Sequence, residues 1–117
     1  MIENFGIGID ISSVKKFKIK PFDNNESFYK KIFSESEIEY CLKFKNSYEK
    51  FAGKFAVKEA LIKSIHDELE LLSIQTSYFN SKPTVKISNS QQNYRFLVSL
   101  SHDKEVAIAV VISEKII

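Results

Sequence analysis

Three ionisable residues, Asp10, Glu59 and His102, stand where the surrounding sequence makes polarity unexpected. Asp10 ends a glycine-containing alternating segment, and Glu59 stands among alanines and phenylalanines in the stretch FAGKFAVKEA at 51–60. A buried carboxylate is costly unless it is paired or bound to a cation. Carboxylate oxygens suit Mg²⁺, whose shell is commonly completed by water and substrate phosphates. These residues therefore form a candidate magnesium–phosphate site.

Lysines accompany Glu59 at close spacing. Lys54, Lys58 and Lys63 carry mobile point charges that can neutralise phosphate. The spacing alone does not establish that Asp10 and Glu59 meet. The alternative is a salt-bridged helix on a sheet, with His102 as an ordinary turn residue, and both interpretations stay open at this point.

The first element that must position these residues is a strand around Asp10. Apolar residues alternate with Asn4, Gly6, Gly8 and Asp10, which is the period of a β-strand with one apolar face. These apolar residues are Phe5, Ile7, Ile9 and Ile11. The missing side chains at Gly6 and Gly8 leave room for a ligand or for a crowding neighbour to approach the backbone.

Helices are predicted between residues 12 and 67. We expect Ser12 or Ser13 to cap a short basic helix that ends at Lys20 before Pro21. Ser34 and Glu37 have the spacing of a capping box, which predicts a helix from there to about Lys45. A long helix follows, from about Tyr48 to Asp67. One face of this helix, at three- and four-residue steps, carries Ala52, Phe55, Ala56, Glu59, Ile62 and Lys63.

The remaining sequence predicts strands joined by polar turns. The expected strands are 72–78, 85–87, 94–101 and 106–112, with turns at 80–83 and 102–105 and a polar loop at 88–93. The last strand is apolar on both faces, so we expect it to be central or covered on both sides. The order predicts an α+β fold, with a mainly antiparallel sheet packed against the long helix.

Composition limits the class of protein. The 117 residues suit one domain, and a formal charge of +2 is too small to indicate nucleic-acid binding by itself. A small basic interaction domain, for RNA for example, stays an alternative because of the lysines at 15–20, but no nucleic-acid motif supports it. The single cysteine, Cys41, suits a reducing compartment. We see no signal peptide and no membrane-spanning run, so we expect a cytoplasmic protein without membrane contact.

Three segments together resemble a known family. The segments GIGIDI at 6–11, FAGKFAVKEA at 51–60 and SLSH at 99–102 are similar to the three signature motifs of the holo-[acyl-carrier-protein] synthases, the short 4′-phosphopantetheinyl transferases. They occur in the family's order, and the similarity covers nearly the whole chain, so residues 1–117 are expected to be one transferase domain of that fold. The resemblance implies transfer of phosphopantetheine from coenzyme A to a serine of apo acyl carrier protein, with release of 3′,5′-ADP.

The resemblance also implies roles for individual residues. Asp10 and Glu59 would hold Mg²⁺, and Glu59 or a water that it holds would accept the serine proton. Lys63 would contact the phosphates, so that Asp10, Glu59 and Lys63 form the catalytic set. Coenzyme A would be bound by Lys54, Lys58, Lys63 and His102. The basic residues Lys15, Lys16 and Lys18 would dock the acidic carrier protein, and the family's short members form homotrimers with active sites at subunit boundaries.

One stretch departs from the family pattern. A glycine-rich turn usually follows the long helix, but residues 64–72 contain no glycine and three acids. Either the helix runs on, or a differently built loop lies there. A catalytically degenerate relative, which binds carrier protein or coenzyme A without transfer, is therefore the alternative function. The turn at 80–83 also has Ser81 where the family usually has glycine.

Overall fold

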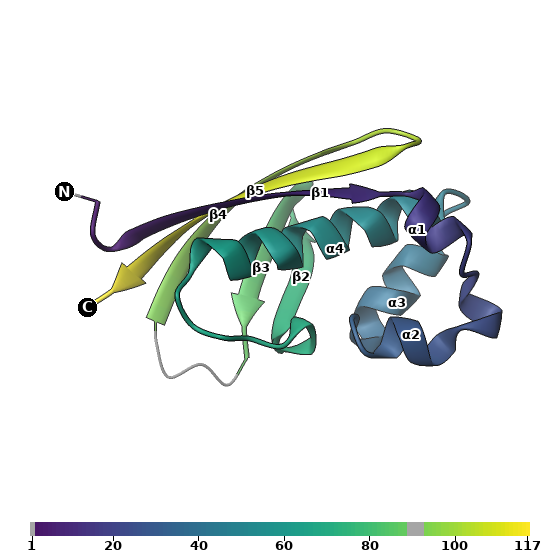
Figure 1. The fold of residues 1–117 in the computed structure, drawn as a ribbon, viewed down its shortest axis with the longest axis horizontal. Helices are drawn as coiled ribbons and strands as arrows, with labels where there is room; N and C mark the ends of the chain where they lie inside the picture. Colours follow the sequence, from purple (N-terminus) through teal and green to yellow (C-terminus); the bar gives the residue numbers. More distant parts are fainter. Residues whose placement is uncertain (1, 89–92) are drawn as a thin grey trace.

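The structure, a computed structural model, describes residues 2–88 and 93–117, and it is an elongated α+β fold (Figure 1). The elements in chain order are β1 Phe5–Ser13, α1 Lys15–Lys18, the 3-10 helix η1 Phe22–Asn24, α2 Glu26–Lys30, α3 Glu35–Leu42, α4 Ser47–Ser64, the 3-10 helix η2 Leu71–Ser73, β2 Ile74–Phe79, β3 Lys82–Ile87, β4 Asn93–His102 and β5 Val106–Ile116. No helix in these two ranges is long and apolar enough to cross a membrane.

The strands form two antiparallel sheets where the sequence suggested one. The larger sheet has the order β1-β5-β4, and the smaller sheet pairs β2 with β3. The apolar last strand β5 is central, as predicted. Figure 1 shows α4 running along the larger sheet, with the short helices gathered at one end. The predicted α+β class and the packing of the long helix on a sheet are confirmed.

The glycines of β1 allow α4 to lie directly on this strand. A Cβ added at Gly8 would overlap the carbonyl oxygen of Ala60, and one at Gly6 would overlap that of Ser64. The Ser64 carbonyl also accepts a hydrogen bond of 2.9 Å from Ser113 Oγ on β5. The space at the glycines is therefore occupied by a neighbouring helix, and the backbone contact fixes the distance between α4 and the strand that carries Asp10.

The alternating apolar residues of β1 face away from α4, toward solvent. Ile7 is 69% exposed, and Leu97 on β4 is 71% exposed. Ile112 of β5 pairs with both of these residues in the strand register. The same outer face carries Phe5, Ile9, Ile11 and Ile108, all of them exposed. The larger sheet thus has one face packed on α4 and one apolar face that is uncovered in the monomer.

Two helix boundaries differ from the sequence prediction. Helix α4 ends at Ser64 because Ile65 has extended backbone angles, so the helix does not run on to Asp67. Ser12 and Ser13 belong to β1 and cap nothing, since α1 follows Val14 without a side-chain cap. The capping box at the start of α3 is confirmed. Ser34 Oγ accepts from the Glu37 amide, and the Glu37 carboxylate accepts from the Ser34 amide.

Aromatic packing attaches the short helices to α4. Phe17 of α1 is fully buried and contacts Tyr29, Phe33 and Phe51 at ring-centroid distances of 5.9 to 6.2 Å. This burial holds α1 in place while its lysines stay exposed.

The predicted turns are also present. Asn80 and Ser81 join β2 to β3 with positive φ angles of 50° and 66°, and residues 103–105 join β4 to β5. Most of the loop predicted at 88–93 lies outside the described residues.

Candidate functional site

Asp10 and Lys63 meet between β1 and α4. Lys63 Nζ lies 3.2 Å from Asp10 Oδ1 and donates a 3.1 Å hydrogen bond to the Ile9 carbonyl. The Lys63 side chain is 55% exposed, whereas that of Asp10 is 15% exposed. This pair is therefore open to solvent on the lysine side, where an incoming phosphate can compete for the ammonium.

Glu59 stands one helical turn before Lys63, on the same face of α4. It is half-buried, and among the described residues it forms no ion pair. Residues 2–88 and 93–117 contain no cluster of three or more acidic, histidine or cysteine side chains that could hold a metal ion. The carboxylates of Asp10 and Glu59 supply hard oxygen donors, and this donor type fits Mg²⁺ when water and phosphate oxygens complete its shell.

His102 belongs to a different edge of the sheet. It ends β4, and its Nδ1 lies 3.5 Å from Glu49 Oε1. Asp10 is on β1, and β5 lies between these two strands, so one chain does not bring His102 together with Asp10. His102 instead lines a cavity of about 420 Å³, together with Tyr40, Lys50, Tyr78, Ser81, Pro83 and Leu100.

Lys54 is buried where α4 faces β2. Its Nζ donates hydrogen bonds to Thr76 Oγ1 at 3.0 Å and to the Thr76 carbonyl at 3.4 Å. The ammonium lies 4.8 Å and 5.4 Å from the ring centroids of Tyr40 and Tyr78. Burial lowers the pKa of Lys54. Because Tyr40 and Tyr78 also line the His102 cavity, Lys54 lies directly behind the wall of that cavity.

Lys58 is also buried and makes an ion pair with Glu37 of α3. The distance between Lys58 Nζ and Glu37 Oε1 is 2.7 Å, and both side chains are fully buried. Sequence reasoning does not predict this ion pair, although the capping-box spacing with Ser34 identifies Glu37 as a helix-capping residue. The available signal is the sequence position of Lys58, which lies about 100° from Glu59 and about 140° from Lys63 on a helical wheel.

The basic helix α1 presents its lysines to solvent beside α4. Lys15, Lys16 and Lys18 are exposed. Lys16 Nζ lies 3.8 Å from the centroid of the Phe55 ring, which joins the basic helix to the motif helix. Lys15 and Lys18 line a cavity of about 650 Å³ together with Ile19, Lys104 and other residues of the β4–β5 turn.

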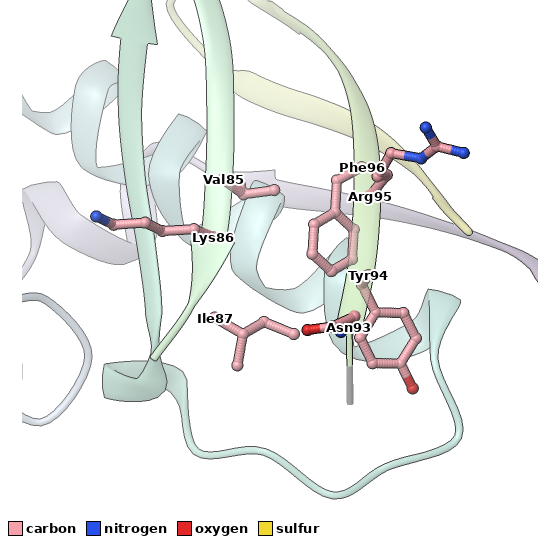
Figure 2. Close-up of a pocket in the computed structure, with 7 residues that line it drawn as sticks. All are labelled: Val85, Lys86, Ile87, Asn93, Tyr94, Arg95 and Phe96. Carbon is pink, nitrogen blue, oxygen red and sulfur yellow. The ribbon is translucent and has the colours of Figure 1, made fainter. Parts of the chain in front are cut away.

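The glycine-poor segment after α4 is an irregular connection with bends at residues 65–67, and it ends in η2. Tyr94 Oη on β4 donates a 2.7 Å hydrogen bond to Asp67, and this contact ties the segment to the larger sheet. Tyr94 also lines a hollow of about 460 Å³ between β3 and β4 (Figure 2). Figure 2 shows the Phe96 ring between these strands, while the charged ends of Lys86 and Arg95 extend away. None of the predicted site residues lines this hollow, which is the boundary between the two sheets.

Comparison with known proteins shows which family the chain resembles. The profile of the 4′-phosphopantetheinyl transferase superfamily matches residues 6–111. The chain is 34% identical to the holo-[acyl-carrier-protein] synthase of Mycoplasma capricolum, over 97% of this chain and 96% of that protein. It is 36% identical to the synthase of Thermodesulfovibrio yellowstonii, over 96% of this chain and 98% of that protein.

Solved structures show the same fold. The Helicobacter pylori holo-[acyl-carrier-protein] synthase in complex with coenzyme A superposes with a TM-score of 0.77, at 33% identity over 92% of this chain and 99% of that chain. The synthase from Bacillus anthracis, in complex with CoA (3′,5′-ADP), gives a TM-score of 0.76 at 30% identity, over 93% of this chain and 95% of that chain. The motifs, the fold and these relatives together establish that the chain belongs to the 4′-phosphopantetheinyl transferase superfamily.

Proposed function

We propose that this protein transfers 4′-phosphopantetheine from coenzyme A to a serine of apo acyl carrier protein and releases 3′,5′-ADP. The observation that carries the proposal is the position of Asp10, Glu59 and Lys63. The first two family motifs meet here, since α4 packs on the glycines of β1 and Lys63 contacts Asp10. Relatives at 34% and 36% identity over nearly the full chain are holo-[acyl-carrier-protein] synthases.

Each of these side chains has a task in the transfer. The serine oxygen bonds to the phosphorus nearer the pantetheine, and the bond from that phosphorus to the oxygen of 3′,5′-ADP breaks. Asp10 and Glu59 would hold Mg²⁺, which when bound neutralises charge on the diphosphate. Lys63 shifts from Asp10 to the phosphates and stabilises the charge that develops on the leaving group. Glu59, or a water that it holds, accepts the serine proton.

The nucleotide end of coenzyme A is assigned to the cavity that His102 lines. Lys50 and His102 provide cationic or hydrogen-bonding groups there, and Tyr40 and Tyr78 provide flat aromatic surface. Lys54 supports this wall from behind through its contacts with both tyrosines. We therefore expect Lys54 to affect coenzyme binding through the two tyrosines and through the small cavity of about 290 Å³ that it lines.

The uncovered apolar face of the larger sheet supports a homotrimer. Exposed isoleucines on two adjacent strands, together with Leu97, form a surface of the kind that subunit interfaces cover. An active site built from residues of two subunits would also explain why Asp10 and His102 lie on different edges of one sheet. We expect Ile9→Glu to yield monomers in light scattering and to abolish transfer, because one subunit then lacks its neighbour's part of the site.

The exposed lysines of α1 are the proposed docking surface for the carrier protein. Lys15, Lys16 and Lys18 present positive charge beside the catalytic helix, which suits an acidic partner. Complementary charge of this kind raises the association rate and is screened by salt. We place the enzyme in the cytoplasm, in keeping with its single reduced thiol, Cys41, which is buried.

The test is an incubation of the protein with apo acyl carrier protein, coenzyme A and Mg²⁺, followed by mass spectrometry of the carrier. We expect the mass to increase by one phosphopantetheine, and we expect Asp10→Ala and Glu59→Ala to lose this activity. The departure at 64–72 favours one alternative, a binding protein without transferase activity. That alternative predicts coenzyme A binding by calorimetry with an unmodified carrier, and this result would refute the proposal.

A further inference from the structure

Lys58 has no donor left for a ligand. Its Nζ donates to the Ile32 carbonyl at 2.7 Å, to Glu37 Oε1 at 2.7 Å and to the Leu71 carbonyl at 3.1 Å. A lysine ammonium has three N–H groups, so all of its donors are used within the protein. The side chain is also fully buried. The motif lysine beside Glu59 therefore acts on the protein rather than on coenzyme A.

Glu37 joins three elements through one carboxylate. Besides Lys58 of α4, it accepts hydrogen bonds from the Ser34 amide at 2.8 Å, the Thr76 amide at 2.9 Å and Thr76 Oγ1 at 2.6 Å. Burial alone would raise the pKa of Glu37, but the hydrogen bonds from Lys58 and Thr76 outweigh it and lower the pKa below 4.5. The ionised pair thus ties α4 to α3 and to strand β2.

Helix α4 is held from two sides, and Glu59 lies on a third. Successive residues on an α-helix point about 100° apart. Ala60 and Ser64 contact the glycines of β1. Lys58 points about 160° away from Ala60, and Glu59 points about 100° from Ala60 on the other side. A helix fixed at both the glycine contact and the Lys58 contact cannot rotate about its axis, so the direction of Glu59 is set.

We infer that Glu37 and Lys58 are a positioning pair for the transfer reaction. By fixing the rotation of α4, they hold Glu59 and Lys63 toward Asp10, and the bond to Leu71 anchors the connection after α4 where the family's glycine turn is missing. This inference rests on the proposed function. Supporting residues outside a metal site typically change metal affinity or activity by about 10- to 100-fold when they are replaced.

The experiment compares Lys58→Met, Glu37→Gln and the double variant Glu37→Leu/Lys58→Met with the wild type. A matched control pair is available on α2, where Lys30 and Glu26 form an ion pair of 3.2 Å with side chains 64% and 52% exposed. Lys30→Met and Glu26→Gln make the same chemical changes in solvent. The readouts are Mn²⁺ binding by electron paramagnetic resonance, metal-free coenzyme A binding by calorimetry, thermal midpoint and transfer rate.

We expect Mn²⁺ affinity and kcat of the Lys58 variants to fall by at least about 10-fold. Metal-free coenzyme A binding should change less than threefold, and the control variants should match the wild type in every readout. The double variant removes both charges, so we expect it to recover stability relative to Lys58→Met without recovering Mn²⁺ affinity. If Lys58→Met does not fold, the double variant and Glu37→Gln decide the question.

Two results would overturn the inference. Wild-type Mn²⁺ affinity in a folded variant would make the pair purely structural, and a selective loss of metal-free coenzyme A binding would make Lys58 a coenzyme ligand. Failure of the proposed function is distinguishable from both, because it would appear as an unmodified carrier with the wild-type protein, whatever the variants bind.

Discussion

Two lysines of α4 each form an ion pair with a carboxylate, and the two pairs differ in their exposure to solvent. Lys58 and Glu37 are fully buried at 2.7 Å, whereas Lys63 and Asp10 lie at 3.2 Å with the lysine 55% exposed. A buried pair is costly to break because the remaining charge is left without water, and an exposed pair contributes little to stability. The comparison teaches that the buried pair is suited to holding the helix in place. The exposed pair is suited to exchanging its partner for a phosphate.

The largest expected effect is on stability at the buried pair. Lys58→Met leaves the Glu37 carboxylate buried without its cation, and we expect the free energy of unfolding to fall by about 3–5 kcal/mol. The measurement is urea denaturation followed by circular dichroism. Lys63→Met, which removes the same group from the exposed pair, should change the free energy of unfolding by less than about 1 kcal/mol. Equal losses in the two variants would contradict the comparison.

The second-largest effect is on catalysis, and here the open pair matters more than the buried pair. If Lys63 moves to the phosphates, Lys63→Met should lower kcat by about 100-fold, or roughly 2.7 kcal/mol of transition-state stabilisation. Its thermal midpoint should stay at the wild-type value. The measurement is the initial rate of carrier modification at saturating coenzyme A. A variant with full activity would remove Lys63 from the catalytic set.

The sequence assigns both residues of the open pair to the candidate site, although it predicts no direct contact between them, and it predicts nothing about the buried pair. Asp10 and Lys63 were assigned from motifs, and strand periodicity placed Asp10 on the glycine face, where α4 lies. The Glu37–Lys58 contact joins residues 21 positions apart, and Thr76 is 39 positions from Glu37. Local periodicity carries no information about such contacts.

Other features of the fold were equally hard to predict. The end of α4 at Ser64 was missed because residues 65–67 contain no glycine or proline to signal it. The outward direction of the β1 isoleucines was hidden because an apolar strand face is ordinarily the buried one.

The third prediction concerns the glycine contact that both pairs depend on. A Cβ at Gly8 would overlap the backbone carbonyl of Ala60, so Gly8→Ala must push α4 away from β1. We expect a loss of about 1–3 kcal/mol in the free energy of unfolding, as for other overpacked sites. Transfer activity should fall as well, because Asp10 and Glu59 move apart.

Gly53→Ala is the control for this change. Its Cβ would meet only the end of the Leu100 side chain, at 3.2 Å, which can move aside. Alanine is favoured over glycine within a helix by about 1 kcal/mol, so this variant should be neutral or more stable than the wild type. A Gly8→Ala protein as stable and active as Gly53→Ala would show that the close helix–strand contact is not needed.

The smallest effect is on the pH dependence of stability, and it separates the buried pair from the open one. The pKa of Glu37 is lower in the folded protein than its ordinary value of 4.5. The unfolded chain therefore binds the proton more readily, and the stability from this carboxylate is complete above pH 4.5 and is lost as the pH falls through the folded pKa. Thermal midpoints of wild type and Glu37→Gln should differ most near pH 7 and converge in acid.

Asp10→Asn, made in the exposed pair, should show a much smaller difference at either pH, because its partner lysine is solvated. A constant offset for Glu37→Gln from pH 7 to pH 3 would mean that the Glu37 side chain stabilises the fold through its shape and hydrogen bonds, without its charge.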